Sequence, residues 1–187
     1  LKVLIGLADG ECVETVLIPE PRRLTQCLST QVGCAMGCSF CASAGIGFRR
    51  NLSAGEIVEE VLLAGEAAVS QLAEGAPTQP TNIVFMGIGE PLANYEQTAR
   101  ALRILNAPWG LGIGWRRITV STIGLPAAMI RLAQEFPQVN IAVSLHAPDD
   151  ELRNRIVPSN TRIGIQAILE AARRLSLIHI SEPTRLL

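Results

Sequence analysis

The sequence predicts an α/β fold built on a parallel sheet or barrel, and two observations support this prediction. Short segments rich in Val, Ile and Thr alternate with longer segments whose apolar residues recur at helical spacing. Glycine-rich or polar motifs directly follow three of the predicted strands. Alternating strands and helices form parallel sheets, whose ligands collect at the carboxyl ends of the strands. We therefore expect one α/β domain with a ligand site at that edge of the sheet.

Four segments are predicted to be strands, because β-branched residues are enriched in them. They are Val13–Ile18, Asn82–Met86, Arg117–Thr122 and Asn140–Leu145.

Four further segments are predicted to be helices. The first has the clearest start, because Ser53 and Glu56 have the spacing of a capping box and apolar residues follow at helical spacing. The predicted helices are Ser53–Ala73, Asn94–Leu105, Pro126–Phe136 and Gly164–Leu175.

The composition is that of a globular domain with a substantial core. The chain has 187 residues, 48% of them hydrophobic, and a formal net charge of −1. This near-neutral charge excludes a strongly basic nucleic-acid-binding surface over the whole molecule, so any RNA contact must be local. No apolar run reaches the roughly 18 residues of a membrane span, and no secretory leader is evident. We expect a cytoplasmic protein with no membrane contact.

Three of the five cysteines lie close together, with the spacing C-x3-C-x2-C at Cys34, Cys38 and Cys41. Such clustering does not suit a secreted disulfide framework and favours metal binding. Thiolates are soft ligands that suit iron–sulfur clusters. Three of them leave one iron of a [4Fe–4S] cluster free to bind a substrate. The alternatives are a zinc site, which needs a fourth protein ligand when structural, or inert cysteines.

A glycine-rich loop and several polar residues follow the later predicted strands. In the loop Gly87–Pro91, Gly89 lets the backbone approach a ligand closely, and Glu90 can accept a hydrogen bond from an amino group. Polar groups of a ligand can also bind at other predicted strand ends, at Ser121 and in Ser144-Leu145-His146. From the residues alone, buried polar groups with a purely structural role are an equal alternative.

Beyond these motifs, the sequence resembles the radical S-adenosylmethionine (SAM) methyltransferases of RNA adenine, the RlmN and Cfr family. The resemblance rests on residues 27–34, 47–52, 86–92, 116–122 and 144–153, and it covers roughly residues 1–175. It implies a partial (β/α) barrel of the radical SAM type, incomplete at its C-terminal side. It also implies two cofactors, a [4Fe–4S] cluster on Cys34, Cys38 and Cys41, and SAM bound by Gly89, Glu90, Ser121, Ser144, Leu145 and His146.

The resemblance further implies methylation of adenine C2 in 23S ribosomal RNA and in transfer RNA. In the family, one SAM methylates a cysteine near the C-terminus, and a second is cleaved to a deoxyadenosyl radical that activates this methyl group. Cys27 matches the cysteine that resolves the RNA–protein crosslink by forming a disulfide, and Glu14 matches the proton acceptor. Without the resemblance, Cys27 would be an ordinary buried thiol and Glu14 a surface glutamate on a strand.

Residues 176–187 differ from the family and are similar to translated adapter or misassembled sequence. We therefore expect residues 1–175 to form a partial radical SAM core and residues 176–187 to be an artefactual tail. The methyl-carrying cysteine would lie downstream, so we expect the chain as written to be inactive in methyl transfer. The family also implies an electron donor such as flavodoxin, and we expect a monomer.

Two other functions remain open from the sequence. Methylation of adenine C8 shares all the quoted motifs, and C2 is favoured only as the more common activity. A non-enzymatic iron–sulfur or zinc-binding module would bind no SAM, and the glycine-rich loop Gly87–Glu90 argues against it.

Overall fold

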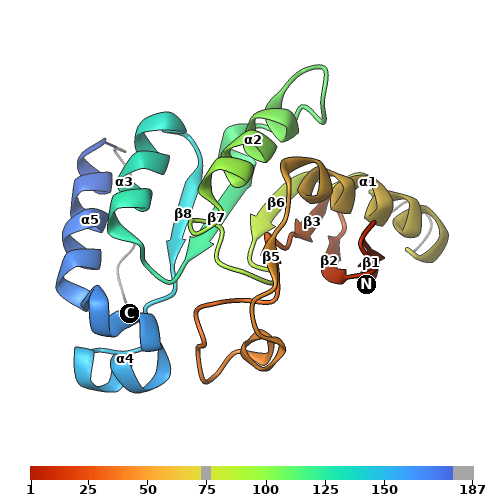
Figure 1. Cartoon of the computed structure of the whole chain (residues 1–187). Helices are drawn as coiled ribbons and strands as arrows, with labels where there is room; N and C mark the ends of the chain where they lie inside the picture. Colours follow the sequence, from red (N-terminus) through yellow and green to blue (C-terminus); the bar gives the residue numbers. More distant parts are fainter. Residues whose placement is uncertain (73–76, 179–187) are drawn as a thin grey trace.

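The computed structural model describes residues 1–72 and 77–178 and shows one sheet with a layer of helices packed against it (Figure 1). The six strands of the main sheet are β1 (Lys2–Gly6), β2 (Cys12–Glu20), β3 (Arg23–Cys27), β6 (Asn82–Phe85), β7 (Ile118–Thr122) and β8 (Asn140–Val143). The α-helices are α1 (Ala54–Gln71), α2 (Tyr95–Asn106), α3 (Pro126–Glu135), α4 (Asp150–Ile156) and α5 (Ile165–Ile178).

The main sheet has the strand order β1-β2-β3-β6-β7-β8. The strands β3, β6, β7 and β8 are parallel, as the strand–helix alternation predicts. The first three strands instead form an antiparallel meander. The prediction of strand–helix alternation is therefore wrong at this end, where β1 and β3 were not predicted. Both are short, five-residue strands, and the loops that join them to β2 leave no room for a crossover helix.

The predicted helices are confirmed with small shifts at their ends, and one helix was missed. The capping box forms as expected, since the Ser53 side chain accepts from the Glu56 N–H and the Glu56 side chain accepts from the Ser53 N–H. The missed helix α4 has only seven residues, too few for a clear apolar period. The helix α5 continues to Ile178, past the predicted domain boundary at residue 175, and residues 179–187 lie outside the described residues. That boundary stays a prediction.

The two faces of the sheet differ in burial. Buried and half-buried residues alternate along β2, β3, β6 and β7. Most of the buried apolar residues form a large core with α1, α2, α3 and α5, and Leu17 and Leu24 form a smaller cluster with Ala64 and Ala68 of α1. The half-buried residues lie on the other face of the sheet, which we call the inner face. The sheet is a partial barrel: among the described residues it does not close, and β8 is an edge strand.

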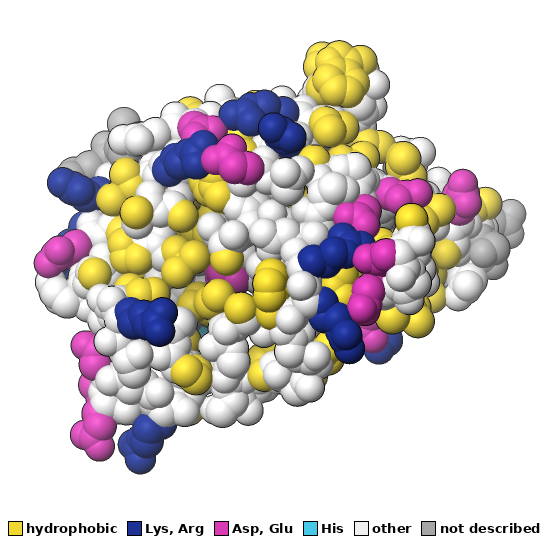
Figure 2. Space-filling view, viewed as in Figure 1, with side chains coloured by type: hydrophobic (Ala, Val, Ile, Leu, Met, Phe, Trp, Pro, Cys, Tyr) yellow, Lys and Arg dark blue, Asp and Glu magenta, His cyan; other side chains and the backbone are white. Residues whose placement is uncertain are grey.

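Charged side chains are mixed on the surface. On the face in Figure 2, Lys and Arg lie beside Asp and Glu, and no broad basic patch is visible. The ion pairs include Arg50 with Asp9 and Glu56, and Arg131 with Glu96 and Glu135. No helix among the described residues is both long and apolar enough to cross a membrane.

One carboxyl group is buried in the core between α1 and the sheet. Glu60 is 0% exposed, and one of its carboxylate oxygens accepts from the Ser29 N–H at 3.0 Å. Its other oxygen, Oε1, has no hydrogen-bond partner. Burial raises the pKa of Glu60 well above its ordinary value of 4.5, and the Ser29 N–H opposes this effect only in part.

We predict that Glu60→Gln stabilises the fold at neutral pH but not at acidic pH. Near pH 4.5 and below, Glu60 is protonated in the folded chain, so glutamine and glutamic acid are similar. As the pH rises above 4.5, the unfolded chain releases this proton more readily than the folded chain. Wild-type stability then falls relative to the variant by up to about 1.4 kcal/mol per pH unit between the two pKa values.

Urea unfolding of both proteins between pH 4.5 and pH 8 measures this difference. Glu59→Gln, at an exposed position of the same helix, is the control and should change the free energy of unfolding little. An advantage of Glu60→Gln that does not grow with pH would contradict the prediction.

Candidate functional site

The three clustered cysteines and the loops after three parallel strands line one cavity of about 280 Å³. This volume is near the lower end of the range for small-molecule sites. The cavity lies where the carboxyl ends of β6, β7 and β8 meet, as the sequence predicts. Residues from the sequence motifs that line it are Cys34, Cys38, Cys41, Gly87, Gly89, Glu90, Ser121, Ser144 and His146.

The loop that carries the cysteines starts from a short antiparallel ribbon. Strands β4 (Gln31–Val32) and β5 (Arg50–Asn51) pair on either side of it, and the Arg49 N–H donates to the Val32 carbonyl. Gly33 has φ +70°, and a Cβ at this position would lie 1.5 Å from the Gly47 carbonyl oxygen. Only glycine permits this crossing of the two backbones, which fixes where the loop leaves the ribbon.

The cysteines differ in burial. Cys38 is buried, Cys34 is half-buried and Cys41 is exposed, and all of them are free. Burial raises the pKa of the Cys34 and Cys38 thiols, and the charge of neighbouring cysteines adds to this effect. A cationic iron cluster would reverse this balance, because bound thiols are deprotonated.

The donor set fits a [4Fe–4S] cluster better than a single ion. In the part of the chain that the structure describes, no three His, Cys, Asp or Glu side chains are grouped to hold a metal ion. A four-iron cluster requires a different arrangement, because each thiolate binds its own iron. Cys34, Cys38 and Cys41 all line the one cavity, and the strand-end loops add polar groups to its lining that could bind a further ligand.

Glu90 joins three segments around the cavity. Its side chain is 2% exposed, and its two carboxylate oxygens accept from the Leu92 and Ile123 N–H groups, both at 2.9 Å. Its own N–H donates to the Gln31 side chain. Burial raises the pKa of Glu90, and these backbone donors oppose the effect. Glu90 therefore has a structural role beside the ligand-binding role that the sequence predicts.

The other predicted SAM contacts follow β7 and β8. The Ser121 and Ser144 hydroxyl oxygens lie 3.3 Å apart, so these two strand ends touch at the cavity. His146 has φ 59°, an uncommon left-handed conformation for a residue other than glycine. Its ring packs against Phe40 of the cysteine loop, with the ring centroids 4.3 Å apart. Leu145 is not among the lining residues, and its carbonyl accepts from Arg153.

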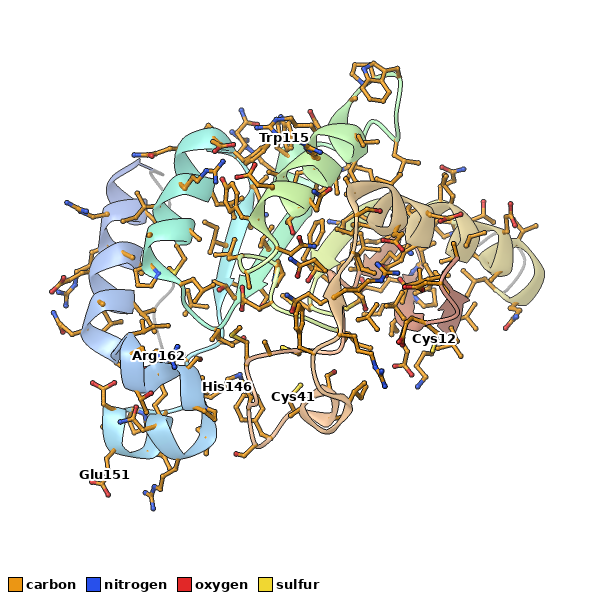
Figure 3. All side chains as sticks on the ribbon, in the orientation of Figure 1. Cys12, Cys41, Trp115, His146, Glu151 and Arg162 are labelled. Atoms are coloured by element: carbon orange, nitrogen blue, oxygen red, sulfur yellow. The ribbon has the colours of Figure 1, made fainter. Side chains whose placement is uncertain are left out.

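Figure 3 labels Cys41 of the cysteine loop and His146 of the segment after β8, both of which line this cavity. Cys12, also labelled, lies apart from them at the start of β2 and does not line the cavity.

The predicted catalytic residues Cys27 and Glu14 lie on the inner face of the sheet but do not line the cavity. Cys27 is paired with Val16 in the antiparallel register, and Glu14 is two residues from Val16. Cys27 and Glu14 are therefore diagonal neighbours on the same face. Burial raises the pKa of Cys27, while a hydrogen bond from the backbone N–H of Met86, a cavity residue, lowers it.

Glu14 lies at the surface and is not a buried base. Its side chain is 42% exposed, and its carboxylate accepts from the Lys2 ammonium group at 2.8 Å. The structure thus brings Glu14 near Cys27 but pairs it with a surface lysine. Apolar neighbours in the sequence did not reveal this, because residues beside one another on a strand point to opposite faces.

The sequence analysis missed one residue with extensive contacts at the site. Arg153 of α4 is 0% exposed, and its guanidinium contacts the loops after β7 and β8. Burial lowers its pKa, although a guanidinium remains protonated in proteins. Because α4 was not predicted, Arg153 was not assigned to any element. The sequence signal that could have revealed this helix is its N-cap residue, Asp149.

Comparisons with known proteins match most of this chain to one family. The sequence pattern of the Radical SAM superfamily matches residues 28–182. A crystal structure of a radical SAM methyltransferase from Sphaerobacter thermophilus is 48% identical, with a TM-score of 0.89 over 96% of this chain and 51% of that one.

The similar curated proteins are described as RNA methyltransferases. A probable dual-specificity RNA methyltransferase RlmN from Salinispora tropica is 53% identical over 91% of this chain and 46% of its own length. A dual-specificity RNA methyltransferase RlmN from Desulfotalea psychrophila is 50% identical over 89% of this chain and 46% of its own length.

A cysteine loop and strand-end motifs around one cavity of a partial barrel define a radical SAM core. This chain belongs to the radical SAM superfamily, whose members use a [4Fe–4S] cluster and SAM. It spans about half the length of the curated relatives that it matches.

We predict that Gly33→Ala disrupts the cysteine loop. The new methyl group would overlap the Gly47 carbonyl oxygen, and alanine is strained at this positive φ. We expect a loss of about 3 kcal/mol or more in the free energy of unfolding, together with a lower iron content after anaerobic reconstitution.

The matched control is Gly45→Ala, in the same loop, where a Cβ would meet no atom within 4 Å. Chemical denaturation and iron analysis of both variants measure the effect. Equal stability and iron content in the two variants would show that the close approach at Gly33 does not matter.

Proposed function

We propose that this chain is the cofactor-binding core of a radical SAM methyltransferase that acts on C2 of adenine in 23S ribosomal RNA and in transfer RNA. The observation that supports it most is the shared cavity, where the three cysteines face the polar ends of β6, β7 and β8. The names of the relatives at about 50% identity support RNA as the substrate.

In this proposal the cysteine loop holds the cluster and the strand ends hold SAM. Cys34, Cys38 and Cys41 bind three irons of a [4Fe–4S] cluster, and no protein thiolate binds the fourth. When bound, the cluster supplies the electron that cleaves SAM reductively. On the opposite wall, Ser121 and Ser144 offer two hydroxyls to the polar groups of SAM.

Glu90 and the loop beside it orient the amino group of SAM. Each carboxylate oxygen of Glu90 already accepts one backbone N–H and keeps further capacity to accept. A carboxylate fixed from two sides needs no reorganisation to bind an ammonium group. Gly89, with φ +106°, lets the loop pass close to Gln31, where a Cβ would lie 2.6 Å from the Gln31 side chain.

Cys27 and Glu14 are assigned to later steps of the reaction. Cys27 is the resolving thiol, and its position beside the Met86 backbone places it next to the cavity. Glu14 is the proton acceptor, on the same sheet face as Cys27. Its ion pair with Lys2 is exposed and involves Oε1 alone, so the carboxylate keeps capacity to accept a proton from adenine.

The remaining partners belong to the same proposal. An electron donor such as flavodoxin would reduce the cluster, and the chain would act as a monomer. The main rival is methylation at C8, since the cavity residues do not distinguish the two carbons. A non-enzymatic iron–sulfur or zinc module is the other rival, and it predicts no SAM binding.

We predict that each of Cys34→Ala, Cys38→Ala and Cys41→Ala abolishes assembly of the [4Fe–4S] cluster, because a cluster held by two thiolates is not retained. Absorption spectra and iron and sulfide analysis after anaerobic reconstitution measure this. Cys12→Ala and Cys27→Ala are the controls, because neither residue lines the cavity, and both should keep the full cluster. Loss of the cluster in Cys27→Ala would make Cys27 a ligand and not the resolving thiol.

The position of methylation is tested with the uninterrupted parent gene that encodes residues 1–175, expressed in a bacterial host that lacks its own adenine-C2 methyltransferase. Mass spectrometry of digested ribosomal and transfer RNA should show 2-methyladenosine. 8-Methyladenosine would support the C8 rival, and no methyladenosine would contradict an RNA methyltransferase. The same host strain without expression of this gene is the control.

A further inference from the structure

Arg153 is the largest of the fully buried side chains, with 0% exposure. Its Nε donates to the Leu145 carbonyl at 3.0 Å, and Nη2 donates to the Ile123 carbonyl and to the Ser144 carbonyl at 3.5 Å. Its Nη1 donates to the Asn160 side chain. None of the ion pairs among the described residues includes it.

A buried guanidinium that is bound mainly by carbonyl groups is costly unless the surrounding groups are held in place. Here the accepting carbonyls belong to the two loops that follow β7 and β8. Ile123 and Ser144 themselves line the cavity. The planar guanidinium, with donors in fixed directions, therefore sets the distance between the two loops.

The same helix also contacts the cysteine loop. The Ser39 N–H, between Cys38 and Cys41, donates to the Ile156 carbonyl at the end of α4 at 2.9 Å. The segment Pro158–Arg162, which follows α4, supplies Asn160 to Arg153. Thus α4 connects the cysteine loop to the loops on the opposite wall of the cavity.

We propose that Arg153 is a positioning residue for the SAM site. It aligns the loops after β7 and β8 against the cysteine loop. This inference rests on the proposed SAM site. Arg153 would not contact SAM itself and would act by holding in place the loops that do. His146 is one residue that must be held in place, because its φ of 59° is strained. The carbonyl of the preceding residue, Leu145, accepts a hydrogen bond from Arg153. With this anchor the His146 ring stays beside Phe40 and the Ser144 hydroxyl stays at the cavity.

The test compares Arg153→Lys with Arg155→Lys in the reconstituted 187-residue chain. Lysine keeps the positive charge but cannot hold several carbonyls in fixed directions. Arg155 is an exposed residue of the same helix and serves as the matched control. Isothermal titration with SAM gives the affinity, iron analysis gives cluster content, and circular dichroism reports the fold.

We expect Arg153→Lys to keep its cluster and fold but to bind SAM about tenfold or more weakly, the equivalent of at least one lost hydrogen bond to a charged group. Arg155→Lys should match the wild type. The spectral change that SAM causes in the electron paramagnetic resonance of the reduced cluster should also be altered in Arg153→Lys alone. Wild-type SAM affinity and spectrum in a folded Arg153→Lys would overturn the inference.

Hydrogen exchange of the wild type tests the inference without a variant. SAM should slow amide exchange together in residues 144–147 and in α4, although α4 does not line the cavity. Protection of the loop without protection of α4 would also overturn the inference, even if Arg153→Lys fails to fold. A wild type that holds its cluster but binds no SAM would instead contradict the proposed function.

Discussion

The site depends on the parallel pairing of β3, β6, β7 and β8. Because these strands run in one direction and in matched register, their carboxyl ends meet at one edge. The helices between them pack on one face and bury two apolar clusters there, a large one and a small one between α1 and the strands β2 and β3. The loops at this edge are thereby brought together from positions that are more than 50 residues apart in the sequence, such as Gly89 and Ser144.

The polar residues beside the site are buried and extensively hydrogen-bonded. Glu90 binds backbone N–H groups of two loops, and Arg153 binds backbone carbonyls of two loops. Both groups lie where water is largely excluded, so their hydrogen bonds are strong and their geometry is well defined. Glu60 contrasts with them, because one of its oxygens has no hydrogen-bond partner and its burial raises its pKa. Glu90 and Arg153, unlike Glu60, thus have partners for the polar atoms that they bury beside the cavity.

Much of this arrangement could be predicted from the sequence. The spacing of Cys34, Cys38 and Cys41 and the motifs after the predicted strands indicated one ligand site, and the structure brings these residues to one cavity. The alternation of strands and helices indicated the parallel sheet, but it did not predict the antiparallel pairing of β1 to β3 or the antiparallel ribbon of β4 and β5. Such pairing is decided by contacts across the sheet that no local pattern in the sequence records.

The remainder could not be predicted because it depends on tertiary contacts. Nothing in the sequence around Arg153 shows that its charge is satisfied by carbonyls of two distant loops. The pairing of Glu14 with Lys2 across β1 and β2 depends on a strand that was not predicted. For the same reason, the structural role of Glu90 as a bridge between loops emerged only from the fold.

We propose that SAM binds in the cavity that the cysteine loop and the strand ends line, and that its amino and carboxylate groups would bind the iron that no cysteine ligates. Electron–nuclear double resonance of the reduced, reconstituted chain tests this most directly, with SAM labelled by ¹⁵N in the amino group or ¹⁷O in the carboxylate. The account predicts hyperfine coupling of both labels to the cluster. A complete [4Fe–4S] cluster that shows no coupling to either label at saturating SAM would contradict it.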